Sequence, residues 1–228
     1  MALHPQAKAF LDLMASFNAP DISEAGAFAA RSGSHGEPDI SGPLDPTVRI
    51  DNRFFTSSTA DTYIKIYTPA GNGPFNALVY FHGGGWVVNY VGKYDAQCAA
   101  LATMTNSVVI SINYQKAPEH KFPIPFNDCY EGLVHLIDNA AHYHIDSQRI
   151  AIGGASAGGG LAAGLALRVR DEAPAKLVGQ VLLYPMIDDR NIAQPSPTHE
   201  NTAVWSREGN LFGWTSYLGK TPGGDDVP

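Results

Sequence analysis

The chain has 228 residues, of which 44% are apolar and 16% charged, and its formal net charge is −7. This composition excludes a disordered chain, and the length suits one α/β domain with a sizeable core. Lys and Arg form no cluster longer than a neighbouring pair, so neither nucleic acid nor an anionic membrane is expected as a partner.

The N-terminal part is predicted to form a helix followed by a loop. Its apolar residues recur at spacings of four and three, on one helical face: Leu3, Ala7, Phe10, Met14 and Phe17. Residues 32–46 are rich in Gly, Ser, Pro and Asp and are therefore predicted to be a loop. Charged residues interrupt the first apolar runs, so we expect neither a signal peptide nor a membrane span, and we expect a cytoplasmic location.

The middle of the chain alternates between strands and helices. The predicted strands are 48–55, 62–67, 77–81, 107–112, 149–152 and 177–184, and the predicted helices are 94–104, 127–139 and 159–167. The first two strands are expected to pair antiparallel. The later alternation predicts a mostly parallel sheet with right-handed crossovers.

The last predicted strand, 177–184, is apolar almost throughout, which is typical of a buried parallel strand. If no further strand pairs with it, Leu177 to Tyr184 form an exposed hydrophobic edge for self-association or for pairing with another segment. Residues 191–228 mix proline, charge and aromatic side chains without a clear period.

A serine between two glycines follows the strand 149–152. In Gly154-Ala155-Ser156-Ala157-Gly158 the glycines stand two residues before and after Ser156, and a helix of small residues comes next. A sharp strand-to-helix turn requires this pattern because its backbone leaves no room for side chains at those two positions. The pattern predicts that Ser156 is a nucleophile.

A second glycine-rich turn, His82-Gly83-Gly84-Gly85-Trp86, follows the strand 77–81. Attack of a serine oxygen on a carbonyl creates an oxyanion, which needs hydrogen-bond donors already in place. Glycines can turn their N–H groups toward one point, and a helix N-terminus such as Ala157 favours negative charge. We assign the predicted oxyanion hole to Gly83, Gly84 and Ala157, and we expect His82 to brace the loop by hydrogen bonding.

With these two motifs, the segments Asn113–Pro123, Tyr184–Met186 and Trp205–Asn210 make the chain similar to the hormone-sensitive lipase family of esterases. The resemblance covers the whole chain and implies an α/β-hydrolase fold with helices on both faces of the sheet and a helical cap. It implies hydrolysis of small-molecule carboxylic esters with short- to medium-length acyl chains, through an acyl-serine intermediate. No cofactor is expected, and no CxxC or HxxxH spacing suggests a metal.

The same resemblance suggests how the chain is divided. Residues 1–45 would be N-terminal cap helices and a loop, 46–190 the α/β-hydrolase core, and 191–228 a second cap segment. The helices that carry Cys98 and Cys129 would then lie on opposite faces of the sheet, so buried thiols are expected rather than a disulfide.

The chain departs from the family pattern in two ways. The residue before the nucleophile is Ala155, where the family usually has Asp. The triad order of the fold is Ser, then Asp or Glu, then His, but His199 is the single histidine after Ser156, with Asp188 and Asp189 as acid candidates. The favoured interpretation is that the chain lacks its C-terminal strands, which would carry the acid and base, and that alone it is inactive or weakly active.

Two other interpretations stay open. A catalytically silent fragment of the same fold would bind a small ligand, or a partner through the exposed sheet edge. The spacing of Gly154, Gly158 and Gly160 also fits a dehydrogenase, in which a glycine turn binds pyrophosphate. That reading leaves the turn after strand 77–81 unexplained, and the chain contains no Tyr-x-x-x-Lys pair.

Overall fold

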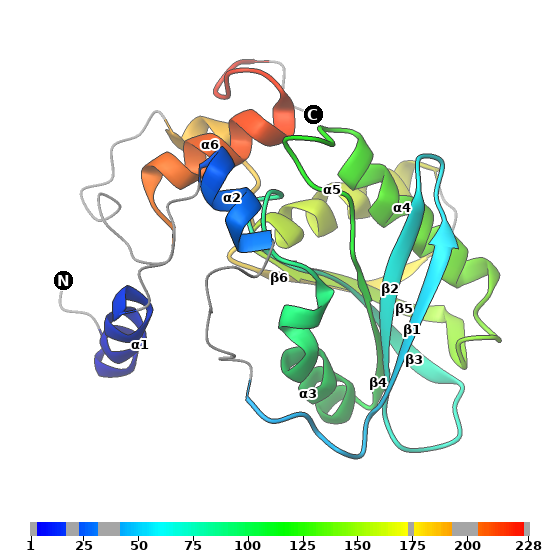
Figure 1. The fold of residues 1–228 in the computed structure, drawn as a ribbon. Helices are drawn as coiled ribbons and strands as arrows, with labels where there is room; N and C mark the ends of the chain where they lie inside the picture. Colours follow the sequence, from blue (N-terminus) through cyan, green and yellow to red (C-terminus); the bar gives the residue numbers. More distant parts are fainter. Residues whose placement is uncertain (1–3, 17–22, 32–41, 173–175, 193–204, 226–228) are drawn as a thin grey trace.

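The computed structural model describes residues 4–16, 23–31, 42–172, 176–192 and 205–225 (Figure 1). Within these residues one sheet of six strands has the order β1-β2-β4-β3-β5-β6. The strands are β1 (Arg49–Thr56), β2 (Asp61–Thr68), β3 (Phe75–Phe81), β4 (Ser107–Ile112), β5 (Ile145–Ala155) and β6 (Leu177–Leu183). β1 is antiparallel to β2 and β2 to β4, whereas β4, β3, β5 and β6 run parallel.

Helices cover both faces of the sheet, as predicted. The 3₁₀ turn η1 (Val91–Tyr94) and α3 (Asp95–Thr105) lie on one side, and α4 (Ile124–Asp138) and α5 (Ala157–Glu172) on the other (Figure 1). Successive side chains of a strand point to opposite faces, so β3 and β4 supply both cores. The core beneath α3 contains Leu78, Tyr80, Cys98, Ala102 and Val109. The core beneath α4 and α5 contains Val79, Phe81, Ile110, Cys129 and Leu161.

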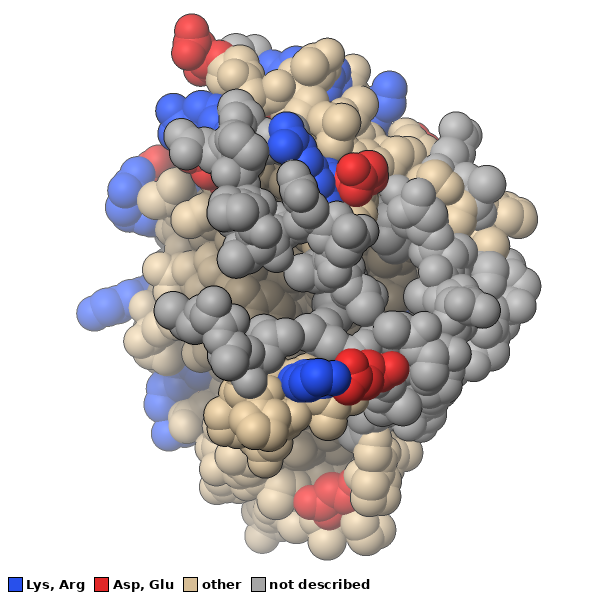
Figure 2. All heavy atoms as spheres, turned by 90° about the vertical axis from the view of Figure 1, so that its left-hand side faces the viewer, with Lys and Arg blue, Asp and Glu red and all other residues tan. Residues whose placement is uncertain are grey.

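The predicted α/β architecture is therefore confirmed, including the antiparallel pair at its start. The two cysteines lie in cores on opposite faces of the sheet, and both are buried free thiols. Among the described residues, no helix has both the length and the apolar character needed to span a membrane. On the face shown in Figure 2, basic and acidic side chains lie interspersed, with no continuous patch of either sign among the coloured residues.

Segments from the two ends of the chain meet above the turn that follows β3. These are α2 (Glu24–Arg31) and α6 (Arg207–Leu218), which lie beside each other in Figure 1, whereas α1 (Pro5–Ser16) stands apart from them. Ala27 of α2 is buried with Val87 and Val88, and Phe212 of α6 packs against this group. The boundaries 1–45, 46–190 and 191–228 stay a prediction.

Residues 191–228, expected to be a second cap segment without a clear period, contain the helix α6, and η2 (Asp189–Ile192) begins just before them. The Ser206 side chain caps α6 by accepting a hydrogen bond from the Gly209 N–H at 2.9 Å, and the helix ends at Gly219 with a φ of 70°. Its buried face includes Gly209, Gly213 and Ser216, and these small residues hide the helical period.

Aromatic packing fixes α6 to the core. Trp86 is 2% exposed, and its ring lies 4.4 Å from the rings of both Trp214 and Tyr217. Because these two side chains of α6 are buried in the core, they are not available to face a substrate.

The edge strand β6 is parallel to β5, as predicted, but it is not buried. Val178 is 60% exposed and Val181 is 52% exposed, and Tyr184 directly after the strand is 77% exposed. Within the described residues, no strand pairs with the outer side of β6. An apolar strand with an open row of backbone donors and acceptors is a site for pairing with other polypeptide.

Candidate functional site

The two glycine-rich turns lie next to each other at one end of the sheet. β3 and β5 are parallel neighbours, and their last residues are in register, with Phe81 opposite Gly154. The turn that starts at His82 and the turn that carries Ser156 therefore emerge side by side at the carboxyl ends of the strands. Sites in open α/β sheets form at this position.

Ser156 occupies a strained turn. Its φ is 55°, in the left-handed region that few residues other than glycine adopt. The Ser156 N–H donates to the Leu183 carbonyl at 2.9 Å, and the Ser156 carbonyl accepts from the N–H groups of Gly160 and Met186, each at 3.0 Å. The side chain is partly exposed at the start of α5, as a nucleophile requires.

The glycines around Ser156 are explained by backbone contacts. A Cβ on Gly158 would collide with the carbonyl oxygens of Phe81 and His82, and a Cβ on Gly154 would collide with the backbone of Gly158. Only glycine lets the start of α5 lie this close to the end of β3. The contact also sets the distance between the serine turn and the neighbouring loop.

The loop after β3 leaves backbone donors free. The Gly84 carbonyl accepts from the N–H groups of Val87 and Val88 at 3.0 and 2.9 Å, and Gly84 has a φ of 121°. Among the described residues, no acceptor meets the N–H of Gly84 or of Gly85. Ala157 is the first residue of α5, where an N–H has no partner within the helix.

Of the predicted oxyanion donors, Ala157 directly follows Ser156 and Gly83 lies beside the serine turn. A Cβ on Gly83 would lie 3.3 Å from the Ser156 Cβ and 3.5 Å from the Tyr94 hydroxyl oxygen. The assignment to Gly83, Gly84 and Ala157 stays a prediction.

His82 is placed as a brace. The ring is fully buried, its Nδ1–H donates to the Gly83 carbonyl at 2.7 Å, and it stacks on Tyr114 at 4.5 Å. The Tyr114 hydroxyl donates to the His82 carbonyl at 2.8 Å. Burial, assisted by the nearby Lys116, lowers the pKa of His82 well below its usual value, so the ring is neutral at neutral pH.

Asn89 is a second brace, which the sequence analysis missed. Its φ is 70°, and its Nδ2 donates to the Gly83 carbonyl at 3.4 Å and to the Tyr94 hydroxyl at 3.3 Å. Asparagine tolerates the left-handed region better than most residues. An asparagine three residues after the HGGGW motif was the available signal.

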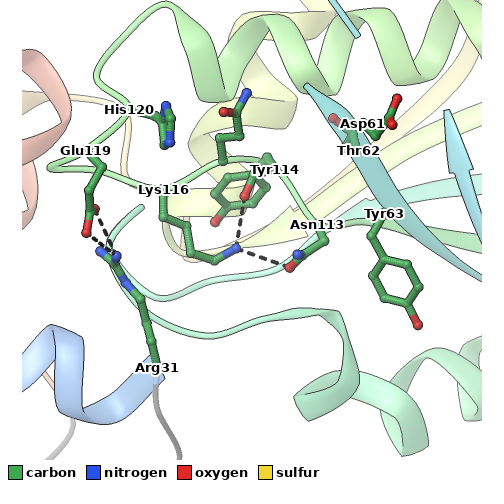
Figure 3. A pocket seen from close by; sticks show the side chains of 10 residues that line it. Arg31, Asp61, Thr62, Tyr63, Asn113, Tyr114, Lys116, Glu119 and His120 are labelled. Carbon is green, nitrogen blue, oxygen red and sulfur yellow. Dashed lines mark hydrogen bonds and ion pairs between the residues drawn. The ribbon is translucent and has the colours of Figure 1, made fainter. Parts of the chain in front are cut away.

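A polar pocket of about 410 Å³ is lined by residues of α2, of β2 and of the segment after β4 (Figure 3). Arg31 reaches from α2 to bind both carboxylate oxygens of Glu119, at 2.8 and 2.9 Å. Glu119 therefore ties α2 to this segment. Lys116 donates to the Asn113 side chain and to the Tyr114 carbonyl, and burial together with Arg31 lowers its pKa to about 8.

Among the described residues, no hydrogen-bond partner is seen for the Ser156 hydroxyl. His199 lies outside the described residues. Asp188 is held by Arg190, which lowers the carboxyl pKa to about 2, and the buried Asp189 accepts from the Gly223 N–H at 2.7 Å. No group of three or more His, Cys, Asp or Glu side chains in the described part could hold a metal.

Sequence comparisons identify related proteins. A family profile described as alpha/beta hydrolase fold matches residues 78–227. The chain is 34% identical over 145 residues to an arylesterase of Saccharolobus solfataricus, a match that covers 64% of this chain and 47% of that protein. It is 35% identical over 144 residues to carboxylesterase NlhH of Mycobacterium tuberculosis, covering 62% of this chain and 45% of that protein. The chain thus spans about half the length of the curated relatives it matches.

Solved structures give longer matches. A bacterial heroin esterase superimposes with a TM-score of 0.87 at 32% identity, covering 99% of this chain and 72% of that one. An ester-hydrolase from the metagenome of Lake Arreo superimposes with a TM-score of 0.85 at 28% identity, covering 100% of this chain and 72% of that one.

Proposed function

The chain belongs to the alpha/beta hydrolase fold family, in its hormone-sensitive lipase branch, and on this basis we propose that it is a serine carboxylesterase. The observation that carries the proposal is the strained Ser156 turn seated against the loop of free glycine N–H groups. Relatives named arylesterase, carboxylesterase and heroin esterase support ester hydrolysis. The proposed substrates are small carboxylic esters with short- to medium-length acyl chains.

The proposed reaction proceeds through an acyl-serine. The Ser156 oxygen attacks the ester carbonyl carbon while a base takes the hydroxyl proton, and the carbonyl oxygen becomes an anion held by N–H groups of Gly84 and Ala157, with Gly83 or Gly85. The carbon–oxygen bond to the alcohol then breaks, and the alcohol leaves with a proton. Water attacks the acyl-serine in the same way, releasing the carboxylic acid and restoring Ser156.

We propose that the acid and base come from polypeptide that pairs with β6. This edge is apolar and uncovered among the described residues, and its last residue, Leu183, accepts the N–H of Ser156. A strand added there would end close to the serine turn, because parallel neighbours end at the same side of the sheet. A cytoplasmic location is part of the proposal, since Cys98 and Cys129 are free thiols.

The test is covalent labelling combined with hydrolysis of p-nitrophenyl butyrate. We expect a fluorophosphonate to add one label to the chain and none to Ser156→Ala, and we expect any hydrolysis above background to vanish in that variant. Loss of triad function costs about a millionfold in turnover in well-studied serine hydrolases. Ser147→Ala is the matched control, because Ser147 lies near the opposite end of β5. Labelling of Ser156→Ala equal to that of the unmodified chain would contradict the proposal.

A second candidate function is binding without catalysis. It is favoured by one observation, the absence of any described hydrogen-bond partner for the Ser156 hydroxyl. In that case the chain would bind a small ester, or a partner at β6, and the fluorophosphonate would leave Ser156 unmodified. When the polypeptide that pairs with β6 is present, labelling of Ser156 supports the esterase, and no labelling supports binding without catalysis.

A further inference from the structure

Tyr94 places a phenol hydroxyl beside the serine turn. Tyr94 ends the 3₁₀ turn η1, just before α3, and its ring packs 5.7 Å from His82. Its hydroxyl oxygen lies 3.5 Å from the position that a Gly83 Cβ would take, and the Ser156 Cβ lies 3.3 Å from that same position. The hydroxyl and the nucleophile therefore approach Gly83 on the same side.

The hydrogen bonds of this hydroxyl leave its proton free. Asn89 Nδ2 donates to the Tyr94 oxygen at 3.3 Å. The Tyr94 oxygen thus accepts one hydrogen bond, whereas no described residue accepts its proton. Burial raises the pKa of Tyr94 to about 12, so the group is a neutral donor at every pH at which an esterase operates.

Asn89 also fixes where this donor points. The same Nδ2 contacts the Gly83 carbonyl at 3.4 Å, so one amide ties the tyrosine to the loop that carries the free N–H groups. A preorganised donor in such a site loses little on reorganisation when negative charge develops. A tyrosine held in this way can act on the reacting atoms directly.

We propose that the Tyr94 hydroxyl donates a hydrogen bond to the anionic oxygen of the tetrahedral intermediate on Ser156, adding a side-chain donor to the backbone donors. The inference rests on the proposed function, because it assumes that Ser156 is the nucleophile. It makes Tyr94 a catalytic residue that binds the transition state more strongly than the planar ester.

The test uses n-butylboronic acid, which needs no turnover. Its boron accepts an electron pair from the Ser156 oxygen, the hydroxyl proton leaves to solvent, and the adduct is a tetrahedral anion that mimics the intermediate. We expect Tyr94→Phe to weaken binding by about tenfold or more, as for loss of a hydrogen bond to a charged group. Tyr80→Phe is the matched control, since Tyr80 is buried and its ring lies 6.2 Å from the Tyr94 ring.

The outcomes separate this inference from the proposed function. Weak binding by Tyr94→Phe, with normal binding by Tyr80→Phe and unchanged melting temperatures, supports the inference. Normal binding by Tyr94→Phe, or equal weakening by Tyr80→Phe, overturns it and leaves the proposed function standing. Binding by Ser156→Ala as tight as by the unmodified chain, or no binding by the unmodified chain, overturns both.

Discussion

Lys116 and His82 are two bases packed on the same aromatic ring. The Lys116 ammonium lies 5.0 Å from the centre of the Tyr114 ring, and His82 stacks on that ring at 4.5 Å. Lys116 forms no ion pair with any described carboxylate, and the pKa of each base is lowered chiefly by burial. Folding therefore shifts both groups toward their neutral forms, although Lys116, with a pKa of about 8, stays largely protonated at neutral pH.

This burial makes stability depend on pH through Lys116. The pKa of Lys116 is about 8 in the folded chain, whereas an unfolded chain holds that proton to about pH 10.4. Between these values the unfolded state binds more protons, so the lysine makes the free energy of unfolding rise with pH, by at most about 1.4 kcal/mol per pH unit. Below about pH 8 its contribution is constant.

We expect Lys116→Met to remove this rise, as measured by urea unfolding at a series of pH values from about 7 to 10. Burial raises the pKa values of Cys98 and Cys129, so these thiols act in the opposite sense above their unfolded pKa, but they do so in both proteins. The difference between the two proteins isolates the lysine. Parallel pH profiles would contradict the prediction.

At the residue scale, the sequence predicted the parts of the site that a local backbone requires. Gly154, Ser156 and Gly158 could be recognised because the sharp turn restricts which residues fit it. Asn89 and Tyr94 could be placed near the site because they follow the HGGGW motif, but their contacts to Gly83 form only when η1 packs against the loop. No spacing in the sequence encodes that contact.

At the scale of elements, the contact between the start of α5 and the end of β3 holds the site together. We expect Gly158→Ala to lower the free energy of unfolding by about 1–3 kcal/mol, because its Cβ would overlap the carbonyl oxygens of Phe81 and His82. Urea unfolding measures this. Labelling of Ser156 should fall as well, since the two turns would be pushed apart.

Gly179→Ala is the control, because a Cβ on this glycine of β6 meets nothing within 4 Å. It should change the free energy of unfolding by less than about 0.5 kcal/mol. Equal effects of the two substitutions would mean that the alanine acts through backbone propensity and not through the contact with β3.

The central elements were predictable and the outer ones were less so. The strands β2, β3 and β4 are rich in β-branched and aromatic residues. β3 and β4 are buried almost throughout, and the first part of β2 is buried at every second residue, so all three have a clear sequence pattern. The helix α6 buries glycines and a serine next to its aromatic residues, so its apolar period is weak. The sequence signals that mark the ends of α6 are its N-cap Ser206 and its C-cap Gly219.

For the molecule as a whole, the two edges of the sheet are the strands β1 and β6. We expect the chain alone to self-associate through β6 and Val181→Lys to reduce this, because a charge on an edge strand opposes pairing. Sedimentation velocity over a range of concentrations measures the association. Phe54→Lys, on the opposite edge strand β1 at a residue 66% exposed, is the matched control.

If Phe54→Lys reduces the association as much as Val181→Lys, general hydrophobicity drives it and the assignment to β6 is wrong. If neither substitution changes it, the chain associates elsewhere or stays monomeric. Only a selective effect of Val181→Lys fits pairing at this edge.

The two hydrogen bonds between the serine turn and the end of β6 make these regions energetically coupled. The Ser156 N–H binds the Leu183 carbonyl, and the Met186 N–H binds the Ser156 carbonyl, so the strained backbone of the nucleophile is held from the edge of the sheet. A segment that pairs with β6 and fixes Leu183 also fixes Ser156. This coupling is reciprocal. If such a segment raises the affinity of a ligand at Ser156 by some factor, a ligand at Ser156 raises the affinity of β6 for the segment by the same factor.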